Sequence, residues 1–152
     1  DNTNSNLKLV LAGSKYINGN KEVYKTIKKY ISKNNLLSYV IMPGYINKKQ
    51  AVYYYNNSFC YVFPSLDEGF GIPLIEAMKA QVPVICSDIE IFKEIGCDSV
   101  IYFNKQDEYD LYNKLKLISE NKTIIETLIS KGNKRANLFN QNNFIKGFEK
   151  LY

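Results

Sequence analysis

The sequence predicts an α/β fold in which helices cover both faces of a parallel sheet. Short apolar runs rich in valine, isoleucine and aromatic residues alternate along the chain with longer stretches of helical periodicity. This alternation is typical of parallel sheets, whose strands are buried on both faces. The 152 residues, of which 45% are hydrophobic and 23% charged, suffice for one domain with its own core. No repeat or change in composition marks a boundary, so we expect residues 1–152 to form a single domain.

The first part of the chain contains three predicted strands and two predicted helices. The strands are expected over residues 7–13, 39–43 and 59–63, and the helices over residues 20–33 and 48–57. Helical spacing places four apolar residues of the first helix on one face: Val23, Ile27, Tyr30 and Ile31. The second helix carries three consecutive tyrosines, which point in different directions. We therefore expect only one or two of them to pack against the sheet.

The second part continues the alternation and ends in helices. Helices are predicted over residues 72–80 and 89–95, and strands over residues 83–86 and 100–103. From Asp107 onward the pattern is helical. Breaks are expected near Gly132 and around residues 140–142, where the helical pattern weakens.

The segment between the third strand and the helix at residue 72 is the most informative of the chain. Glu68 and Glu76 lie eight residues apart, on either side of a turn that contains Gly69 and Gly71. Glycines let the backbone approach a ligand closely or adopt a positive φ. The free N–H groups at the start of the helix suit an anion or hydroxyl oxygens. Both carboxylates can face the crevice at the carboxyl end of the strand, where open α/β sheets bind ligands.

Each of these residues also has a purely structural explanation. Glu68 can be a solvated loop acid, and Glu76 can be an exposed helix residue. Gly69 and Gly71 can simply form a tight turn. That explanation suffices for either glutamate alone. It accounts less well for the complete string of residues 68–78 between a strand and a helix, because the weight of a motif depends on its structural context.

Residues 68–78, Glu-Gly-Phe-Gly-Ile-Pro-Leu-Ile-Glu-Ala-Met, follow Phe-Pro-Ser and resemble the E-x7-E signature of retaining GT-B glycosyltransferases, particularly family 4. The resemblance extends from about Leu7 to about Asn104. It implies a Rossmann-like donor-binding domain, the C-terminal half of a GT-B enzyme. Such an enzyme transfers a hexosyl group from a nucleotide-diphosphate sugar (a UDP-, GDP- or ADP-hexose) to a glycan or lipid-linked acceptor. No metal or other cofactor is expected.

The same resemblance implies roles for the residues of the motif. Glu68 lies beside the donor sugar as the catalytic residue, which positions the sugar and is not a nucleophile. Glu76 holds the ribose hydroxyls. A carboxylate suits both tasks because it accepts two charge-assisted hydrogen bonds at once. Backbone groups of four further residues complete the predicted donor contacts: Gly69, Phe70, Gly71 and Ile72.

Two other segments follow strand ends and are candidates for the donor site. Tyr45 and Ile46 occupy the place where the family reads the nucleotide base through the backbone, although an ordinary turn explains them equally well. Gly13 and Lys15 follow the first strand, and a lysine there can reach a phosphate as a flexible point charge. In a lysine-rich chain a solvated loop is the better explanation of Lys15.

The sequence also departs from the family pattern. Members usually carry one more strand and helix before Leu7, which supply an arginine and a lysine that clamp the diphosphate. The single arginine here is Arg135, in a late helix, and histidine is absent from the sequence. We therefore expect the chain to be most of a donor-binding domain without its acceptor-binding partner domain, and to be inactive alone.

Charge and cysteines suggest partners and location. The net charge of +5 comes mainly from lysines on predicted helix surfaces, which a solvated surface explains best. Attraction to anionic lipid is the alternative, because many relatives act on lipid-linked acceptors; no stripe suited to nucleic acid is present. Cys60 and Cys86 fall in predicted strands and are interpreted as reduced core thiols. The expected location is the cytoplasm, and the lipid alternative would add peripheral contact with the inner face of the membrane.

Two other functions remain open at this stage. The fold can serve a non-catalytic nucleotide-sugar-binding or regulatory module, which replacement of Glu68 would distinguish from a transferase. A GT-B phosphorylase or epimerase is the second alternative, and the family-4-like string disfavours it.

Overall fold

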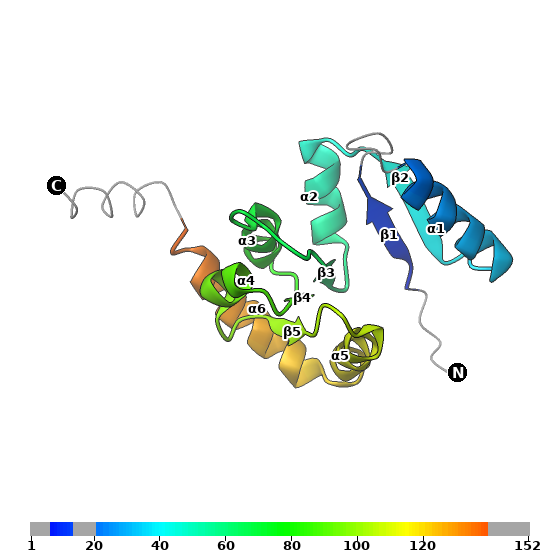
Figure 1. Cartoon of the computed structure of the whole chain (residues 1–152). Helices are drawn as coiled ribbons and strands as arrows, with labels where there is room; N and C mark the ends of the chain where they lie inside the picture. The colour runs from blue at the N-terminus through cyan, green and yellow to red at the C-terminus, as the bar shows by residue number, and fades with distance from the viewer. Residues whose placement is uncertain (1–6, 14–20, 140–152) are drawn as a thin grey trace. The chain divides into compact units, whose positions relative to one another are not determined.

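The computed structural model describes residues 7–13 and 21–139, which form five strands and six helices (Figure 1). The chain divides into two compact units, residues 1–51 (unit 1) and residues 52–152 (unit 2). The single domain predicted over residues 1–152 therefore stays a prediction.

Unit 1 contains a two-stranded parallel sheet and a helix. Strand β1 (Leu9–Ala12) pairs with β2 (Val40–Gly44), and α1 (Lys21–Lys33) lies between them in the sequence. On the predicted apolar face of α1, Ile31 is buried and Ile27 half-buried, whereas Val23 and Tyr30 are exposed. Helix α2 (Lys48–Asn56) begins in unit 1 and continues into unit 2.

Unit 2 contains a three-stranded parallel sheet. The strands are β3 (Tyr61–Phe63), β4 (Val84–Ser87) and β5 (Ile101–Phe103), in the order β3-β4-β5. Helix α3 (Ile72–Lys79) connects β3 to β4, and α4 (Glu90–Gly96) connects β4 to β5. Helices α5 (Glu108–Glu120) and α6 (Lys122–Ala136) follow.

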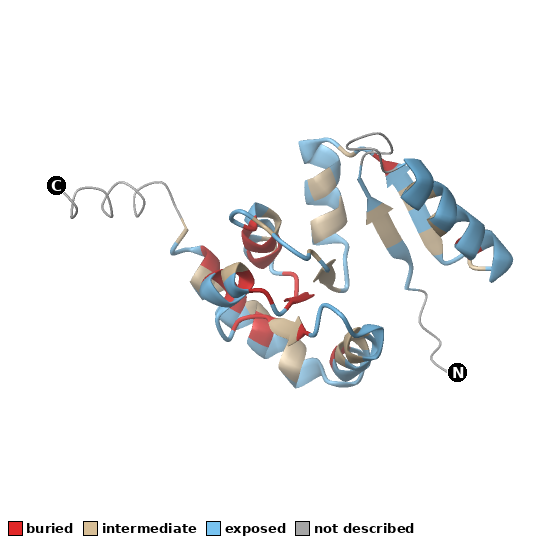
Figure 2. Cartoon of the chain, viewed as in Figure 1, coloured by how far each residue is buried: buried red, intermediate tan, exposed pale blue. Residues whose placement is uncertain are grey.

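The central strand β4 separates two hydrophobic clusters, because successive side chains of a strand point to opposite faces. Val84 and Cys86 belong to the cluster formed with α3, α4 and the end of α6. Ile85 points the other way, into the cluster with Ile118 of α5 and Leu128 of α6. Figure 2 shows the buried residues concentrated around this strand and its covering helices. Helices on both faces of a parallel sheet confirm the predicted fold class.

The predicted strands and helices are present within the described residues, and the bounds differ by at most two residues up to β5. The break expected near Gly132 is wrong, because α6 continues through it. The helical region is interrupted at Asn121, whose side chain accepts a hydrogen bond from the Ile124 N–H and caps α6. Gly132 lies where α6 packs on α3: an added Cβ would lie 3.3 Å from Met78 Cγ. The break expected around residues 140–142 falls outside the described residues.

The cysteines are free thiols in different environments. Cys86 is buried in β4 and Cys60 is half-buried just before β3, whereas Cys97 is exposed. Burial raises the pKa of Cys86 to about 12 and that of Cys60 to about 11. Both thiols therefore stay protonated at neutral pH, as expected for cysteines that serve as small core residues.

Candidate functional site

The predicted motif forms a loop at the carboxyl end of β3 and the first turns of α3. Gly71 is the N-cap residue of α3 and has left-handed backbone angles, φ 71° and ψ 39°. A Cβ at this position would lie 3.0 Å from the ring of Phe92. Gly69 differs: its φ is not positive, and no described heavy atom lies within 4 Å of where its Cβ would be. The fold thus requires glycine at Gly71, while Gly69 leaves backbone open to approach from outside.

Glu68 is half-buried and tied to the start of the same loop. The Ser65 hydroxyl lies 2.9 Å from Glu68 Oε1 and 2.9 Å from the carbonyl oxygen of Asp67, so it can donate to either. A carboxylate has room for several hydrogen bonds, and one donor leaves further acceptor positions. The loop therefore orients Glu68 without exhausting its capacity to bind hydroxyl groups.

Glu76 lies on the exposed side of α3, between the buried residues Ile75 and Ala77. Its carboxylate oxygen Oε2 is 3.5 Å from the hydroxyl of Tyr55, which comes from the last turns of α2. The same hydroxyl is 3.4 Å from the carbonyl oxygen of Pro73. Tyr55 thus contacts α3 at two points, one of which is the second glutamate of the motif.

Tyr61 is the first residue of β3 and a ring partner of Tyr55. Its ring packs edge-on against that of Tyr55, with centroids 5.3 Å apart. Burial raises the pKa of Tyr61 well above its ordinary value; Tyr55 adds to the rise, and the charges of Glu68 and Glu76 raise it further. The hydroxyl of Tyr55, the ring partner of Tyr61, reaches Glu76.

Sequence reasoning did not identify Tyr55 and Tyr61 as part of this site. It expected one or two of the three tyrosines of α2 to pack against the sheet, and Tyr55 does pack against the core cluster. Tyr53, by contrast, is exposed. The sequence held one signal for Tyr55. A partly buried tyrosine hydroxyl usually has a hydrogen-bond partner, whereas phenylalanine would be enough for packing alone.

A lysine reaches the motif loop from the end of β5. The Lys105 ammonium lies 3.4 Å from the carbonyl oxygen of Leu66. The backbone N–H of Lys105 donates to Asp88 Oδ1 over 3.2 Å. Arg135, in contrast, is committed to the fold: its Nε and Nη2 atoms donate to the carbonyl oxygens of Ile95 and Glu94 at the end of α4. These contacts give Arg135 a structural role between α6 and α4.

The remaining predicted site residues that the structure describes lie in unit 1. The Gly13 N–H donates to the carbonyl oxygen of Gly44 over 2.9 Å, at the carboxyl ends of β1 and β2. The next residues are Tyr45, which is 77% exposed, and Ile46, which is half-buried. Gly13 and the predicted base-reading segment thus share one edge of this sheet. Lys15 falls outside the described residues, and its role stays a prediction.

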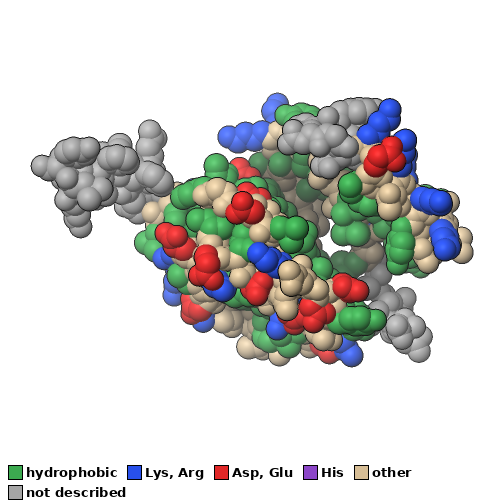
Figure 3. All heavy atoms as spheres, in the orientation of Figure 1, with side chains coloured by type: hydrophobic (Ala, Val, Ile, Leu, Met, Phe, Trp, Pro, Cys, Tyr) green, Lys and Arg blue, Asp and Glu red, His purple; other side chains and the backbone are tan. Residues whose placement is uncertain are grey.

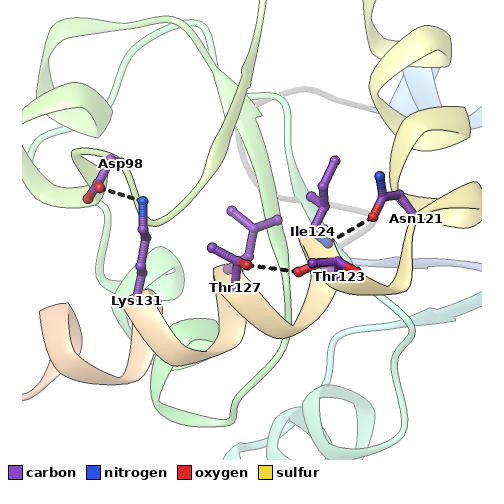
Figure 4. Close-up of a pocket in the computed structure, with 7 residues that line it drawn as sticks. Asp98, Asn121, Thr123, Ile124, Thr127 and Lys131 are labelled. Carbon is purple, nitrogen blue, oxygen red and sulfur yellow. Dashed lines mark hydrogen bonds and ion pairs between the residues drawn. The ribbon is translucent and has the colours of Figure 1, made fainter.

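A separate pocket lies along α6, and Figure 4 shows its lining. It contains an ion pair between Lys131 and Asp98, 2.7 Å apart, and the capped start of α6. Its lining residues are Asp98, Asn121, Thr123, Ile124, Thr127, Leu128 and Lys131. No predicted donor residue belongs to this pocket.

The charged side chains are distributed differently in the two units, and helix α1 of unit 1 carries five lysines and one glutamate. Figure 3 shows acidic and basic side chains mixed over unit 2. Pairs such as Lys93–Glu90 and Lys114–Asp110 are exposed or partly exposed helix neighbours, which favours the solvated-surface explanation of the lysines. Among residues 7–13 and 21–139, no group of three or more histidine, cysteine or acidic residues is arranged to hold a metal ion. Nor does any helix in these ranges have the length and apolar character needed to cross a membrane.

Comparison with known proteins gives a family match and several structural relatives. Residues 1–137 match the family described as glycosyl transferases group 1. The O-antigen chain mannosyltransferase RfbU of Salmonella typhimurium is 44% identical over 66 residues, which cover 43% of this chain and 19% of that protein. The chain thus spans a minor part of the length of this relative.

Two solved structures share the fold. Sucrose-phosphate synthase from Thermosynechococcus elongatus superposes with a TM-score of 0.81 at 28% identity, over 95% of this chain and 37% of that one. Anabaena Alr3699/HepE in complex with UDP-glucose superposes with a TM-score of 0.78 at 18% identity, over 85% of this chain and 35% of that one. At that identity the second likeness concerns the fold alone.

Proposed function

Because the chain belongs to the glycosyl transferases group 1 family, we propose that it binds the nucleotide-diphosphate sugar donor of a retaining glycosyltransferase. The observation that carries this proposal is the loop at the carboxyl end of β3, where Ser65 orients Glu68, followed by α3, where Glu76 contacts Tyr55. Open α/β sheets bind ligands at this edge. In the complete enzyme, the hexosyl group passes to a glycan or lipid-linked acceptor.

The proposed roles follow from the position of each group. Glu76 accepts hydrogen bonds from the ribose hydroxyls, and Glu68 with the backbone of Gly69 orients the hexose. As the bond to the diphosphate breaks, positive charge develops on the sugar, and the fixed carboxylate of Glu68 stabilises it. The N-terminus of α3 favours the negative diphosphate through the positive end of its helix dipole. In this proposal the reaction needs no metal ion.

The sugar and base of the donor are part of the proposal. The relative RfbU is named as a mannosyltransferase, and the HepE structure contains UDP-glucose. We therefore propose a hexosyl donor. The first two ligands to test are UDP-glucose and GDP-mannose, one glucosyl donor and one mannosyl donor.

An amide-resolved NMR titration of the chain with UDP, GDP, ADP and their hexose conjugates tests donor binding. We expect shifts at residues 68–76 and at Tyr45, with one nucleotide preferred. Glu76→Gln is expected to weaken nucleotide binding about tenfold, because one charge-assisted acceptor is lost. The absence of any response at millimolar ligand would contradict the proposal that this chain binds a donor.

The same titration separates the roles of the two glutamates. Glu68→Gln is expected to leave the affinity for the free nucleotide unchanged and to weaken only the hexose conjugates, because Glu68 is assigned to the sugar. In the complete transferase, Glu68→Gln is expected to lower kcat strongly. Unchanged turnover in that variant would favour a non-catalytic sugar-binding module.

A further inference from the structure

Tyr55 lies outside the motif and contacts one of its predicted donor-binding carboxylates, Glu76. Its hydroxyl has two acceptors within reach, Glu76 Oε2 at 3.5 Å and the Pro73 carbonyl oxygen at 3.4 Å. Both acceptors belong to α3, whereas Tyr55 belongs to α2, 21 residues earlier than Glu76. The contact is therefore tertiary, and it fixes the carboxylate relative to a second helix.

The ring of Tyr55 is held firmly enough to make this contact specific. It is half-buried, packs against the core cluster of unit 2 and meets the ring of Tyr61 edge-on at 5.3 Å. A tyrosine ring has few rotatable bonds, so packing of the ring also fixes the position of the hydroxyl. Glu76, by contrast, is an exposed side chain with three torsions, whose carboxylate would otherwise sample many positions.

The direction of the hydrogen bonds favours donation to Glu76. The hydroxyl of Tyr55 has one proton and two acceptors within reach on α3. The charged carboxylate of Glu76 is a stronger acceptor than the carbonyl oxygen of Pro73. Burial and the charge of Glu76 raise the pKa of Tyr55 to about 12, so this donor stays protonated throughout the neutral range.

We propose that Tyr55 is a positioning residue, whose hydroxyl holds the Glu76 carboxylate in the orientation that accepts the ribose hydroxyls of a bound nucleotide. This inference rests on the proposed function, because it assigns the ribose to Glu76. One hydrogen bond from Tyr55 to Oε2 leaves Oε1 and the remaining lone pair of Oε2 for the ligand. Preorganisation of this kind improves affinity by removing the cost of ordering the side chain during binding.

The test measures selectivity for the ribose in single variants. The dissociation constant of the preferred nucleotide (UDP, GDP or ADP) is compared with that of its 2′,3′-dideoxy analogue, in the wild type and in Tyr55→Phe. The variant keeps the ring and removes only the hydroxyl. We expect it to bind the ribonucleotide about three- to tenfold more weakly and the dideoxy analogue with unchanged affinity.

The ratio of the two constants separates positioning from packing. Both ligands are measured on the same sample, so a partly unfolded sample changes both constants equally and leaves their ratio intact. Tyr53→Phe is the matched control, because Tyr53 is an exposed tyrosine of the same helix whose ring meets Tyr54. Its ratio is expected to equal that of the wild type. In Glu76→Gln, addition of Tyr55→Phe is expected to cause no further loss of ribose selectivity.

Distinct results would overturn the positioning role and the proposed function. A wild-type ratio in Tyr55→Phe, or an equal loss for both ligands, would overturn the positioning role alone. A wild type that binds the ribonucleotide and its dideoxy analogue equally would overturn the assignment of the ribose to Glu76. A wild type that binds no nucleotide would overturn the proposed function and this inference with it.

Discussion

At the scale of single residues, the two glycines of the motif have different physical reasons to be glycine. Gly71 combines a positive φ with a position 3.0 Å from the Phe92 ring, so any side chain there is strained twice. Gly69 has neither constraint within the described residues. The first is therefore required by the fold, whereas the second is assigned to the proposed contact between a ligand and the backbone.

Alanine substitutions at the two glycines test this difference. Gly71→Ala is expected to destabilise the chain by about 2 to 4 kcal/mol, from left-handed strain and overlap with Phe92. Gly69→Ala is expected to change stability by less than about 0.5 kcal/mol but to weaken nucleotide-sugar binding about tenfold, because a methyl group occupies the approach. Urea unfolding and calorimetric titration measure the two effects. A Gly69→Ala variant that binds normally would contradict the proposed contact.

The sequence predicted the strand and the helix that flank the motif, but not the tyrosine neighbours of its glutamates. Glu68, Glu76 and the glycines were recognisable because strand, loop and helix follow one another within a short stretch. The contact of Tyr55 with Glu76 depends on how α2 packs against α3, which local periodicity does not determine. Residues that tertiary packing brings to a site are identified only from the structure.

At the scale of the elements, α6 is fastened to α4 through Arg135. Its guanidinium donates to the carbonyl oxygens of Ile95 over 2.8 Å and Glu94 over 2.6 Å, at the C-terminal end of α4. The last carbonyl groups of a helix have no partner within it, and a cation there also complements the helix dipole. The single arginine of the sequence thus serves helix packing.

Arg135→Lys tests whether this arginine is structural. A lysine has one ammonium group and cannot reproduce the fork of two separate donors. We expect the free energy of unfolding to fall by about 1 to 2 kcal/mol, with nucleotide affinity unchanged. Lys134→Gln on the same helix is the control, because Lys134 is exposed, and it is expected to change stability by less than about 0.5 kcal/mol. Weaker nucleotide binding in Arg135→Lys would instead indicate contact with the donor.

The elements were largely predictable, and the error at Gly132 shows what limits such prediction. A glycine inside a helical pattern is unfavourable by propensity, which indicated a break. In the structure the missing Cβ allows α6 to approach Met78 of α3 closely. The gain from packing outweighs the propensity, and the helix continues. Asn121 marks the actual boundary because its side chain caps α6.

At the scale of the whole molecule, the similarities confirm the resemblance to the C-terminal domain of GT-B glycosyltransferases. The hydrophobic core is unevenly distributed along this domain. Strand β4 of unit 2 is buried at all four positions, whereas Ile31 is the one buried hydrophobic residue in the described part of unit 1. A two-stranded sheet is marginally stable by itself. Unit 1 therefore has less burial of its own to resist local opening.

Hydrogen exchange tests this distribution and its link to the ligand. Without nucleotide, the amides of β4 are expected to exchange at least about 100-fold more slowly than those of β1, because opening β4 exposes the core of unit 2. The motif with Glu68 and Glu76 lies in unit 2. A ligand that binds only the native state stabilises whatever it contacts, so a saturating nucleotide is expected to slow exchange in β3 and β4. Unchanged exchange in both strands would contradict donor binding at the motif.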